Sequence, residues 1–403
     1  MAEGPTVSRR GRDMPASPIR KLAPYADGAR KRGVRVYHLN IGQPDIETPR
    51  EMLDAYRSLD EKVVAYGPSG GLADYVEALA AHYRGIGIDV GPEDLLVTTG
   101  GSEAILFALQ AVADVGDEVI VPEPFYTNYN GFAVMSGVEI VPVTARAEDG
   151  FALPPIEEFE RKIGPRTRAI LLCNPGNPTG AVYERGDLEA LGRLARERGL
   201  FLIADEVYRT FVYDDGVEHT SVLELEGLED RTIFTDSVSK QYSACGSRVG
   251  CVATRNGDLV AAMLKFAQAR LCPPTVDQIA ARAALSVPAS YFDEVRDEYR
   301  RRRDILCEAL GRIPGLVCQK PRGAFYTVAR LPIPDAEQFA VFLLEEFEDA
   351  GETVMVAPAA GFYATPGKGL DEVRIAYVLA CDDLRRAMEV FGRGLEVWMA
   401  RVG

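Results

Sequence analysis

Between residues 92 and 255, short apolar runs alternate with longer stretches of helical pattern. The apolar runs are rich in Val, Ile and Leu with little alternation, which is typical of strands buried on both faces of a sheet. They predict strands over Leu95–Thr98 and over residues 118–121, 139–143, 169–173, 201–204 and 232–235. Helices are predicted between them, for example over residues 102–113 and Arg185–Arg198. This alternation predicts an α/β fold with a mainly parallel, doubly wound sheet flanked by helices.

The pattern changes after residue 290, where strands and helices become mixed. The elements predicted there are a helix over residues 291–311, strands near 324–328 and 374–377, and helices near 336–350 and 382–393. We therefore expect a large domain over residues 46–290 and a smaller α+β domain over 291–403, to which an N-terminal arm, residues 1–45, also contributes.

The net charge of the chain limits the kinds of partner that it can bind. The 403 residues include 45 Lys and Arg against 60 Asp and Glu, a net charge of −15 with His neutral. This excess argues against binding to nucleic acid or to an anionic membrane surface. The run of four arginines, 300–303, stands among acidic residues, and we interpret it as the solvated face of a helix.

Cysteine and histidine usage points to a cytoplasmic protein. The seven cysteines are scattered without a Cys-x-x-Cys pair, which fits a reducing compartment. The three histidines have no metal-ligand spacing, so no metal site is expected. No apolar run is long enough for a membrane helix. The first 22 residues are basic and lack an apolar core, so we expect them to form an arm rather than a secretory signal.

Chemically useful side chains follow five of the predicted strands. Ligands of open α/β sheets bind beyond the carboxyl ends of the strands, so these groups can serve one ligand. In chain order they are Gly100-Gly101-Ser102, Tyr126, the loop NPGNPTG (174–180), Asp205 with Tyr208, and Ser237 to Lys240.

The glycine-rich segment before the helix at residue 102 offers an anion site, because free N–H groups and the positive end of the helix dipole meet there. Ser102, Ser237, Ser239 and Arg248 could complete a phosphate cradle. An ordinary turn with a capping serine would look the same, and no P-loop lysine follows.

Lys240 and Asp205 each allow two interpretations. Lys240 could be a surface lysine, or a Schiff-base lysine whose neutral amine attacks a carbonyl. Asp205 ends an apolar strand, where it could cap a turn or hold a pyridine nitrogen protonated, so that the ring becomes an electron sink.

Several motifs together resemble a known family. They are IGQPD (41–45), AYGPSGG (65–71), NPGNPTG, DEVY (205–208), SVSK with GSRVG (237–250) and VRIAYV (373–378). In order and spacing they resemble the class I/II aminotransferases, pyridoxal-phosphate enzymes with the aspartate-aminotransferase fold. The resemblance extends from Ser17 to about Leu395.

The resemblance implies that pyridoxal 5'-phosphate is the cofactor. Lys240 would bind it covalently and move the catalytic proton, and Asp205 would pair with its ring nitrogen. Tyr208 and Asn177 would bond its phenolate oxygen. The phosphate would be held by Gly101, Ser102, Ser237, Arg248 and, from the neighbouring subunit of a homodimer with active sites at its interface, Tyr66.

The substrate residues implied by the resemblance are Arg374, which would bind the α-carboxylate, and Gly42, a backbone contact near it. Tyr126 would stack on the cofactor ring, and Tyr126 and Asn177 would also face the substrate. Without the resemblance, Tyr66 and Tyr126 would be interpreted as core aromatics, Gly42 as a turn glycine and Arg374 as the partner of an acid.

Two departures from the family pattern concern the substrate. Tyr126 stands where many aspartate-specific members have Trp, and Ser102 stands where some bacterial ones have a lysine for the distal carboxylate. A distal cation could come from the basic N-terminal arm or from the partner subunit.

The favoured reaction is ping-pong transamination between aspartate and 2-oxoglutarate, with aromatic amino acids or alanine as alternatives. A carbon–sulfur β-lyase, a non-catalytic regulator and a dehydrogenase are rivals of other classes, the last disfavoured by the lack of Gly-x-Gly-x-x-Gly.

Overall fold

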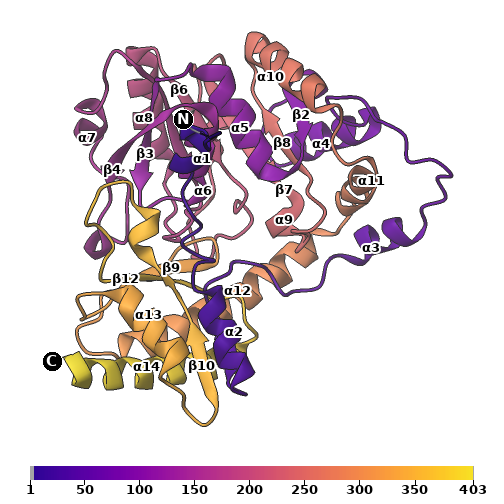
Figure 1. Cartoon of the computed structure of the whole chain (residues 1–403). Coiled ribbons are helices and arrows are strands. Elements are labelled where there is room, and N and C mark those ends of the chain that lie inside the picture. Colours follow the sequence, from indigo (N-terminus) through magenta and orange to yellow (C-terminus); the bar gives the residue numbers. More distant parts are fainter. Residues whose placement is uncertain (1–3, 403) are drawn as a thin grey trace.

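The computed structural model describes residues 4–402 and contains a seven-stranded sheet, seen in the upper part of Figure 1. Only β8 runs antiparallel to its neighbours, so the sheet is mainly parallel, as predicted. In spatial order the strands are β2 (Leu95–Thr98), β8 (Gly250–Ala253), β7 (Thr232–Ser237), β6 (Phe201–Asp205), β5 (Thr167–Cys173), β3 (Glu118–Glu123) and β4 (Glu139–Thr144).

All six strands predicted for this region are present, and their ends agree within two residues. The prediction missed β8, whose sequence Gly-Cys-Val-Ala is too short and too small to stand out as an apolar run. Of the predicted helices, α8 (Arg185–Arg198) has the expected bounds and α5 (Gly100–Val112) begins two residues earlier.

The continuous apolar runs are explained by helices on both faces of the sheet. Leu171 of β5 packs into the cluster that contains Ala104 of α5. Its neighbour Leu172 points the other way, into the cluster that contains Leu188 and Leu191 of α8. Successive residues of one strand are therefore buried on opposite faces, which removes the polar alternation expected of a half-exposed strand.

Two smaller sheets lie in the lower part of Figure 1. β1 (Arg35–His38) pairs in parallel with β10 (Glu352–Met355), so the N-terminal segment contributes a strand to this sheet. The second sheet is antiparallel, with the order β11 (Ala357–Pro358), β12 (Glu372–Ala376) and β9 (Tyr326–Arg330).

Helices surround these two sheets. α12 (Ala289–Gly311) and α14 (Cys381–Val402) pack side by side, and α2 (Ala23–Lys31) packs on α13 (Ala336–Glu345). α13 ends five residues before the predicted limit, because the chain turns through positive φ at Ala350 and Gly351 to enter β10. The domain boundaries at 45/46 and 290/291 remain a prediction.

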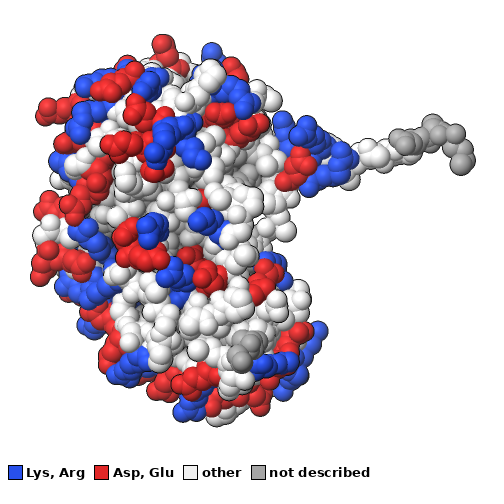
Figure 2. Space-filling view, turned by 90° about the vertical axis from the view of Figure 1, so that its left-hand side faces the viewer, with Lys and Arg blue, Asp and Glu red and all other residues white. Residues whose placement is uncertain are grey.

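The other helices are α1 (Arg9–Asp13), α3 (Arg50–Arg57), α4 (Ala73–Gly85), α6 (Asn128–Ser136), α7 (Ile156–Glu160), α9 (Val238–Gln241), α10 (Gly257–Arg270) and α11 (Thr275–Ala284). Residues 4–16 are exposed, and Figure 2 shows this segment projecting from the body of the molecule, with basic residues at α1. Within residues 4–402, no helix is both long and apolar enough to span a membrane.

The interpretation of arginines 300–303 as a solvated face is wrong for two of them. The Arg302 side chain is 5% exposed and bonds Asp45 at 2.6 Å and Glu298 at 2.8 Å. The Arg303 side chain is 2% exposed and bonds Asp214 at 2.7 Å. The acids that neutralise these residues include Asp45 and Asp214, which are distant in sequence and could not be foreseen from the local charge pattern.

Arg303→Ala is expected to lower the free energy of unfolding by about 2–4 kcal/mol, because it removes a buried ion-pair partner and leaves a cavity. Arg301→Ala, on the same helix, should cost less than about 1 kcal/mol because the Arg301 side chain is 67% exposed. Urea denaturation of both variants measures this difference. Equal losses would contradict the burial of Arg303.

Candidate active site

A cavity of about 480 Å³ lies at the carboxyl ends of the central strands β5, β6 and β7. Its wall brings together twelve of the thirteen predicted site residues, and Tyr66 is the exception. The twelve are Gly42, Gly101, Ser102, Tyr126, Asn177, Asp205, Tyr208, Ser237, Ser239, Lys240, Arg248 and Arg374. The strand ends that the sequence indicated separately therefore surround one space.

Lys240 lies in the short helix α9, directly after β7. Its Nζ donates to the carbonyl oxygen of Gly42 at 3.0 Å and lies 3.8 Å from the Cys245 sulfur. Gly42 is not merely a turn glycine, because a Cβ there would overlap the ring of Tyr326. The absence of a side chain at Gly42 lets its backbone approach both Lys240 and Tyr326.

Asp205 is the last residue of β6 and is 6% exposed. The Tyr129 hydroxyl donates to its Oδ2 at 2.8 Å, whereas its Oδ1 is buried without a hydrogen-bond partner. Burial raises the pKa of Asp205 to about 6, although the bond from Tyr129 and the nearby N–H of Val207 oppose this rise. The free oxygen at the cavity wall thus lacks a donor, and a protonated ring nitrogen would supply one.

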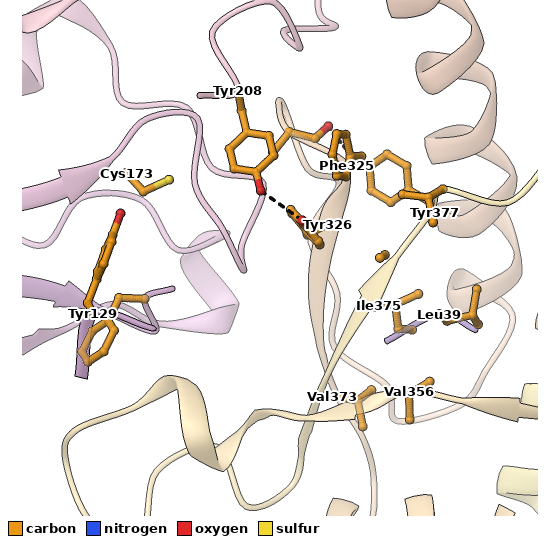
Figure 3. Packing of buried hydrophobic residues seen from close by; sticks show 14 of the residues in the cluster. Leu39, Tyr129, Cys173, Tyr208, Phe325, Tyr326, Val356, Val373, Ile375 and Tyr377 are labelled. Carbon is orange, nitrogen blue, oxygen red and sulfur yellow. Dashed lines mark hydrogen bonds between the residues drawn. The ribbon is translucent and has the colours of Figure 1, made fainter. Parts of the chain in front are cut away.

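Two tyrosines meet at the cavity beside Asp205. The hydroxyls of Tyr208 and Tyr326 are 3.0 Å apart, as the dashed line in Figure 3 marks. Burial raises the pKa of Tyr208 well above its ordinary value, so this hydroxyl stays protonated and can donate a hydrogen bond. Tyr126 lies edge-on to Tyr129 and accepts a bond from Asn128 at 2.8 Å.

The residues predicted for an anion cradle lie where β7 and β8 meet the start of α5. A Cβ at Gly250 would lie 2.7 Å from the Gly101 nitrogen, so glycine allows β8 to pass close to the helix start. The hydroxyls of Ser237 and Ser239 are 2.7 Å apart. Arg248 reaches the backbone of Gly100, where a Cβ would overlap its guanidinium. Hydroxyls, a guanidinium and unpaired N–H groups of the first helical turn together suit a phosphate.

Arg374, in β12, is a buried cation, with an exposure of only 1%. Its guanidinium donates to Asn177 Oδ1 at 3.3 Å and to the Asn40 carbonyl oxygen, and lies 4.7 Å from the centre of the Tyr326 ring. Its Nε has no hydrogen-bond partner. Among residues 4–402, no carboxylate lies within 4 Å of it, and burial lowers its pKa. A guanidinium in this state is suited to a carboxylate brought by a ligand.

Tyr66 does not line the cavity of its own chain. Its side chain is 81% exposed, in a loop with the equally exposed Val63 and Val64. This loop borders a separate surface pocket that also contains Thr99, next to the start of α5. A role of Tyr66 in a neighbouring subunit therefore remains a prediction.

The sequence analysis missed Tyr129 and Tyr326, which contact the predicted residues directly. It also missed a buried ion pair behind α9, in which Arg209 bonds Asp236 at 2.9 Å and Gln241 at 2.9 Å. Arg209 directly follows the DEVY motif and Asp236 directly precedes Ser237, so their positions next to predicted site residues were the available signal. Within residues 4–402, no cluster of His, Cys, Asp and Glu is placed to hold a metal ion.

Comparison with known proteins agrees with this geometry. Residues 34–391 match the family model of aminotransferase class I and II. The aspartate/prephenate aminotransferase of Thermus thermophilus is 35% identical, over 96% of this chain and 98% of that protein. The aromatic-amino-acid aminotransferase 2 of Thermococcus litoralis is 34% identical, over 93% of this chain and 94% of that protein.

A solved structure of the Thermus thermophilus aspartate aminotransferase with maleate has a TM-score of 0.88 to this chain at 34% identity, covering 97% of this chain and all of that one. The fold and the cavity therefore define a pyridoxal-phosphate-dependent transaminase. The chain belongs to the aminotransferase class I and II family.

The raised pKa of Asp205 predicts a pH-dependent stability of the cofactor-free protein. Because the folded pKa of about 6 lies above the ordinary value of 3.8, stability is lost as the pH rises through this range. Asp205→Asn removes the buried charge and should raise the free energy of unfolding above pH 6 by up to about 3 kcal/mol, with a smaller gain at pH 5.

Urea denaturation of cofactor-free protein at pH 5 and pH 7.5 measures this effect, and Asp215→Asn, at an exposed position, is the matched control. A gain for Asp205→Asn that is the same at both pH values would show that the carboxylate titrates normally.

Proposed function

We propose that this aminotransferase moves an α-amino group between an amino acid and a 2-oxo acid by a ping-pong reaction, with aspartate and 2-oxoglutarate as the favoured pair. The observation that carries the proposal is the placement of two incompletely paired charges, Asp205 and Arg374, on the wall of the cavity that contains Lys240. One charge suits the cofactor, and the other suits the carboxylate that every α-amino acid carries.

The residues present fit pyridoxal 5'-phosphate. When bound, the cofactor supplies a cationic ring that withdraws electrons from the α-carbon of the substrate. The free Oδ1 of Asp205 would accept the proton of the ring nitrogen and keep it there. Tyr208 and Asn177 would donate to the ring oxygen, and Tyr126 would cover the ring. Gly101, Ser102, Ser237, Ser239 and Arg248 would hold the phosphate.

Lys240 would anchor the cofactor through Nζ and then act as the general base and acid. Once free, its amine would serve as the base that takes the proton from the substrate α-carbon. Its bond to the Gly42 carbonyl oxygen holds Nζ at the cavity wall. Arg374 would orient the substrate by binding its α-carboxylate through two N–H groups.

The substrate class and the assembly belong to the same proposal. The relatives carry names with aspartate, prephenate and aromatic amino acids, and one solved relative holds maleate, which has two carboxylates. We propose a cytoplasmic homodimer in which the exposed loop with Tyr66 reaches the phosphate site of the partner subunit. Exposed apolar side chains at Val63 and Val64 favour burial against another chain.

A panel of amino donors tests the reaction. With the holoenzyme alone, aspartate should convert the bound cofactor to its amino form, seen as a change in its absorption spectrum, and 2-oxoglutarate should reverse it. Lys240→Ala should abolish both changes and leave a protein that does not retain the cofactor covalently. Lys265→Ala, on the exposed face of α10, is the matched control and should behave like the wild type.

Normal turnover in Lys240→Ala would overturn the mechanism. Release of ammonia and pyruvate from cysteine-type substrates, without any added oxo acid, would instead favour the carbon–sulfur lyase.

Arg374→Ala should lower kcat/KM about 100-fold or more for every amino donor, because a buried charge-assisted bidentate contact to the α-carboxylate is lost. The measurement compares aspartate with alanine, which share that carboxylate and differ in the side chain. A loss confined to aspartate would contradict the assignment of Arg374 to the α-carboxylate.

A further inference from the structure

Four cationic side chains line the active-site cavity, namely Arg20, Lys240, Arg248 and Arg374. Under the proposed function, Lys240 serves the cofactor and the proton, Arg248 the phosphate and Arg374 the α-carboxylate. Arg20 has no role in this scheme. Its side chain is exposed at the cavity wall, and among residues 4–402 no hydrogen bond or ion pair of its guanidinium is formed.

Two contacts fix the segment of Arg20 against the wall that carries Arg374. The Asn40 side chain donates to the carbonyl oxygen of Ile19 at 3.3 Å, while the Asn40 carbonyl oxygen accepts from Arg374. Asn40 therefore links the buried arginine to the residue directly before Arg20. The position of Arg20 at the cavity is thus built into the fold.

A second contact holds the same segment. Pro18 packs on the backbone of Gly361, where a Cβ would overlap its ring. Gly361 belongs to the short helix Ala359–Phe362, and the Phe362 ring lies 5.0 Å from the Arg374 guanidinium.

The neighbouring basic residue behaves differently. Lys21 forms an ion pair with Glu337 of α13 and does not line the cavity. Of two adjacent cations in the N-terminal segment, one is neutralised within the chain and the other is left at the site without an acid. This difference makes Lys21 a matched control for Arg20.

The wall of the cavity offers Arg20 little competition from acidic side chains. Among residues 4–402, Asp205 is the only acidic residue in its wall, and the proposed function assigns Asp205 to the cofactor. Ser102 is neutral, so it cannot pair with a distant carboxylate. The same wall contains Ile19, Ile105 and Phe132, whose apolar side chains offer no competing anion.

We propose that Arg20 binds the second carboxylate of a dicarboxylic substrate and so determines the preference for such substrates. This inference rests on the proposed function, because Arg374 must hold the α-carboxylate at the same time. An arginine is suited to this role, since its fork can bind a carboxylate through two N–H groups. Because the side chain is exposed and unpaired, it can follow the substrate without breaking another bond.

The test compares Arg20→Gln, Arg20→Lys and Lys21→Gln with the wild-type holoenzyme. The donors are aspartate and asparagine, which have nearly the same shape but differ in the charge of the distal group. Arg20→Gln should lower kcat/KM for aspartate about 10- to 100-fold, mainly through KM, and leave asparagine unchanged. Arg20→Lys should recover part of the loss, and Lys21→Gln should have no effect.

Binding of maleate, followed by calorimetry, provides a readout without turnover. Arg20→Gln should weaken maleate binding by a similar factor, whereas Lys21→Gln should not. Unchanged maleate affinity and an unchanged aspartate KM in Arg20→Gln would overturn the inference, as would equal losses for aspartate and asparagine. If no amino donor changes the cofactor spectrum of the wild type, the proposed function itself fails, and this outcome is separate from the others.

Discussion

The candidate active site depends on two buried charged side chains that lack a full set of partners within the chain. Arg374 is almost completely buried and finds only neutral acceptors, from Asn177 and Asn40. Asp205 is buried with one oxygen bonded to Tyr129 and the other free. Burying such groups costs free energy that the surrounding core must offset. Under the proposed function, anionic and cationic groups of the ligands would complete the pairs and recover that cost.

The architecture supplies the rigidity that this arrangement needs. β5, β6 and β7 are buried on both faces, so the residues at their carboxyl ends are fixed by the helices packed on the sheet. Arg374 comes from a different sheet, in β12, and reaches the cavity from the opposite side. Contacts of Gly42 with Lys240 and Tyr326 join the two sides. Neither side alone contains both the group for the cofactor and the group for the substrate.

The local pattern of apolar and polar residues was sufficient to predict the strands and the site residues that directly follow them. The apolar runs predicted six strands of the large sheet, and the residues after them include Lys240, Asp205 and other parts of the cavity wall. The pattern failed where burial depends on distant segments. Arg302 and Arg303 lie in a charged run, yet Asp45 and Asp214 cover them from far away in the sequence. Tyr129 and Tyr326 could not be told from core aromatics, because their hydroxyl partners are set only by the tertiary fold.

Arg374 is buried and Arg20 is exposed. This difference suggests how the range of substrates can change while the fold stays the same. Replacing a buried, neutrally bonded guanidinium alters the core that holds it, so Arg374 is constrained by stability as well as by binding. An exposed arginine such as Arg20 adds little to stability, because its charge is already in water in the folded protein without a ligand. Selection can therefore move or remove a cation at the cavity entrance at little cost to folding. Under the two proposals, the buried Arg374 would recognise the carboxylate common to all amino acids, and the exposed Arg20 would recognise the variable side chain. On this argument, a serine at position 102 need not mean that dicarboxylic substrates are excluded.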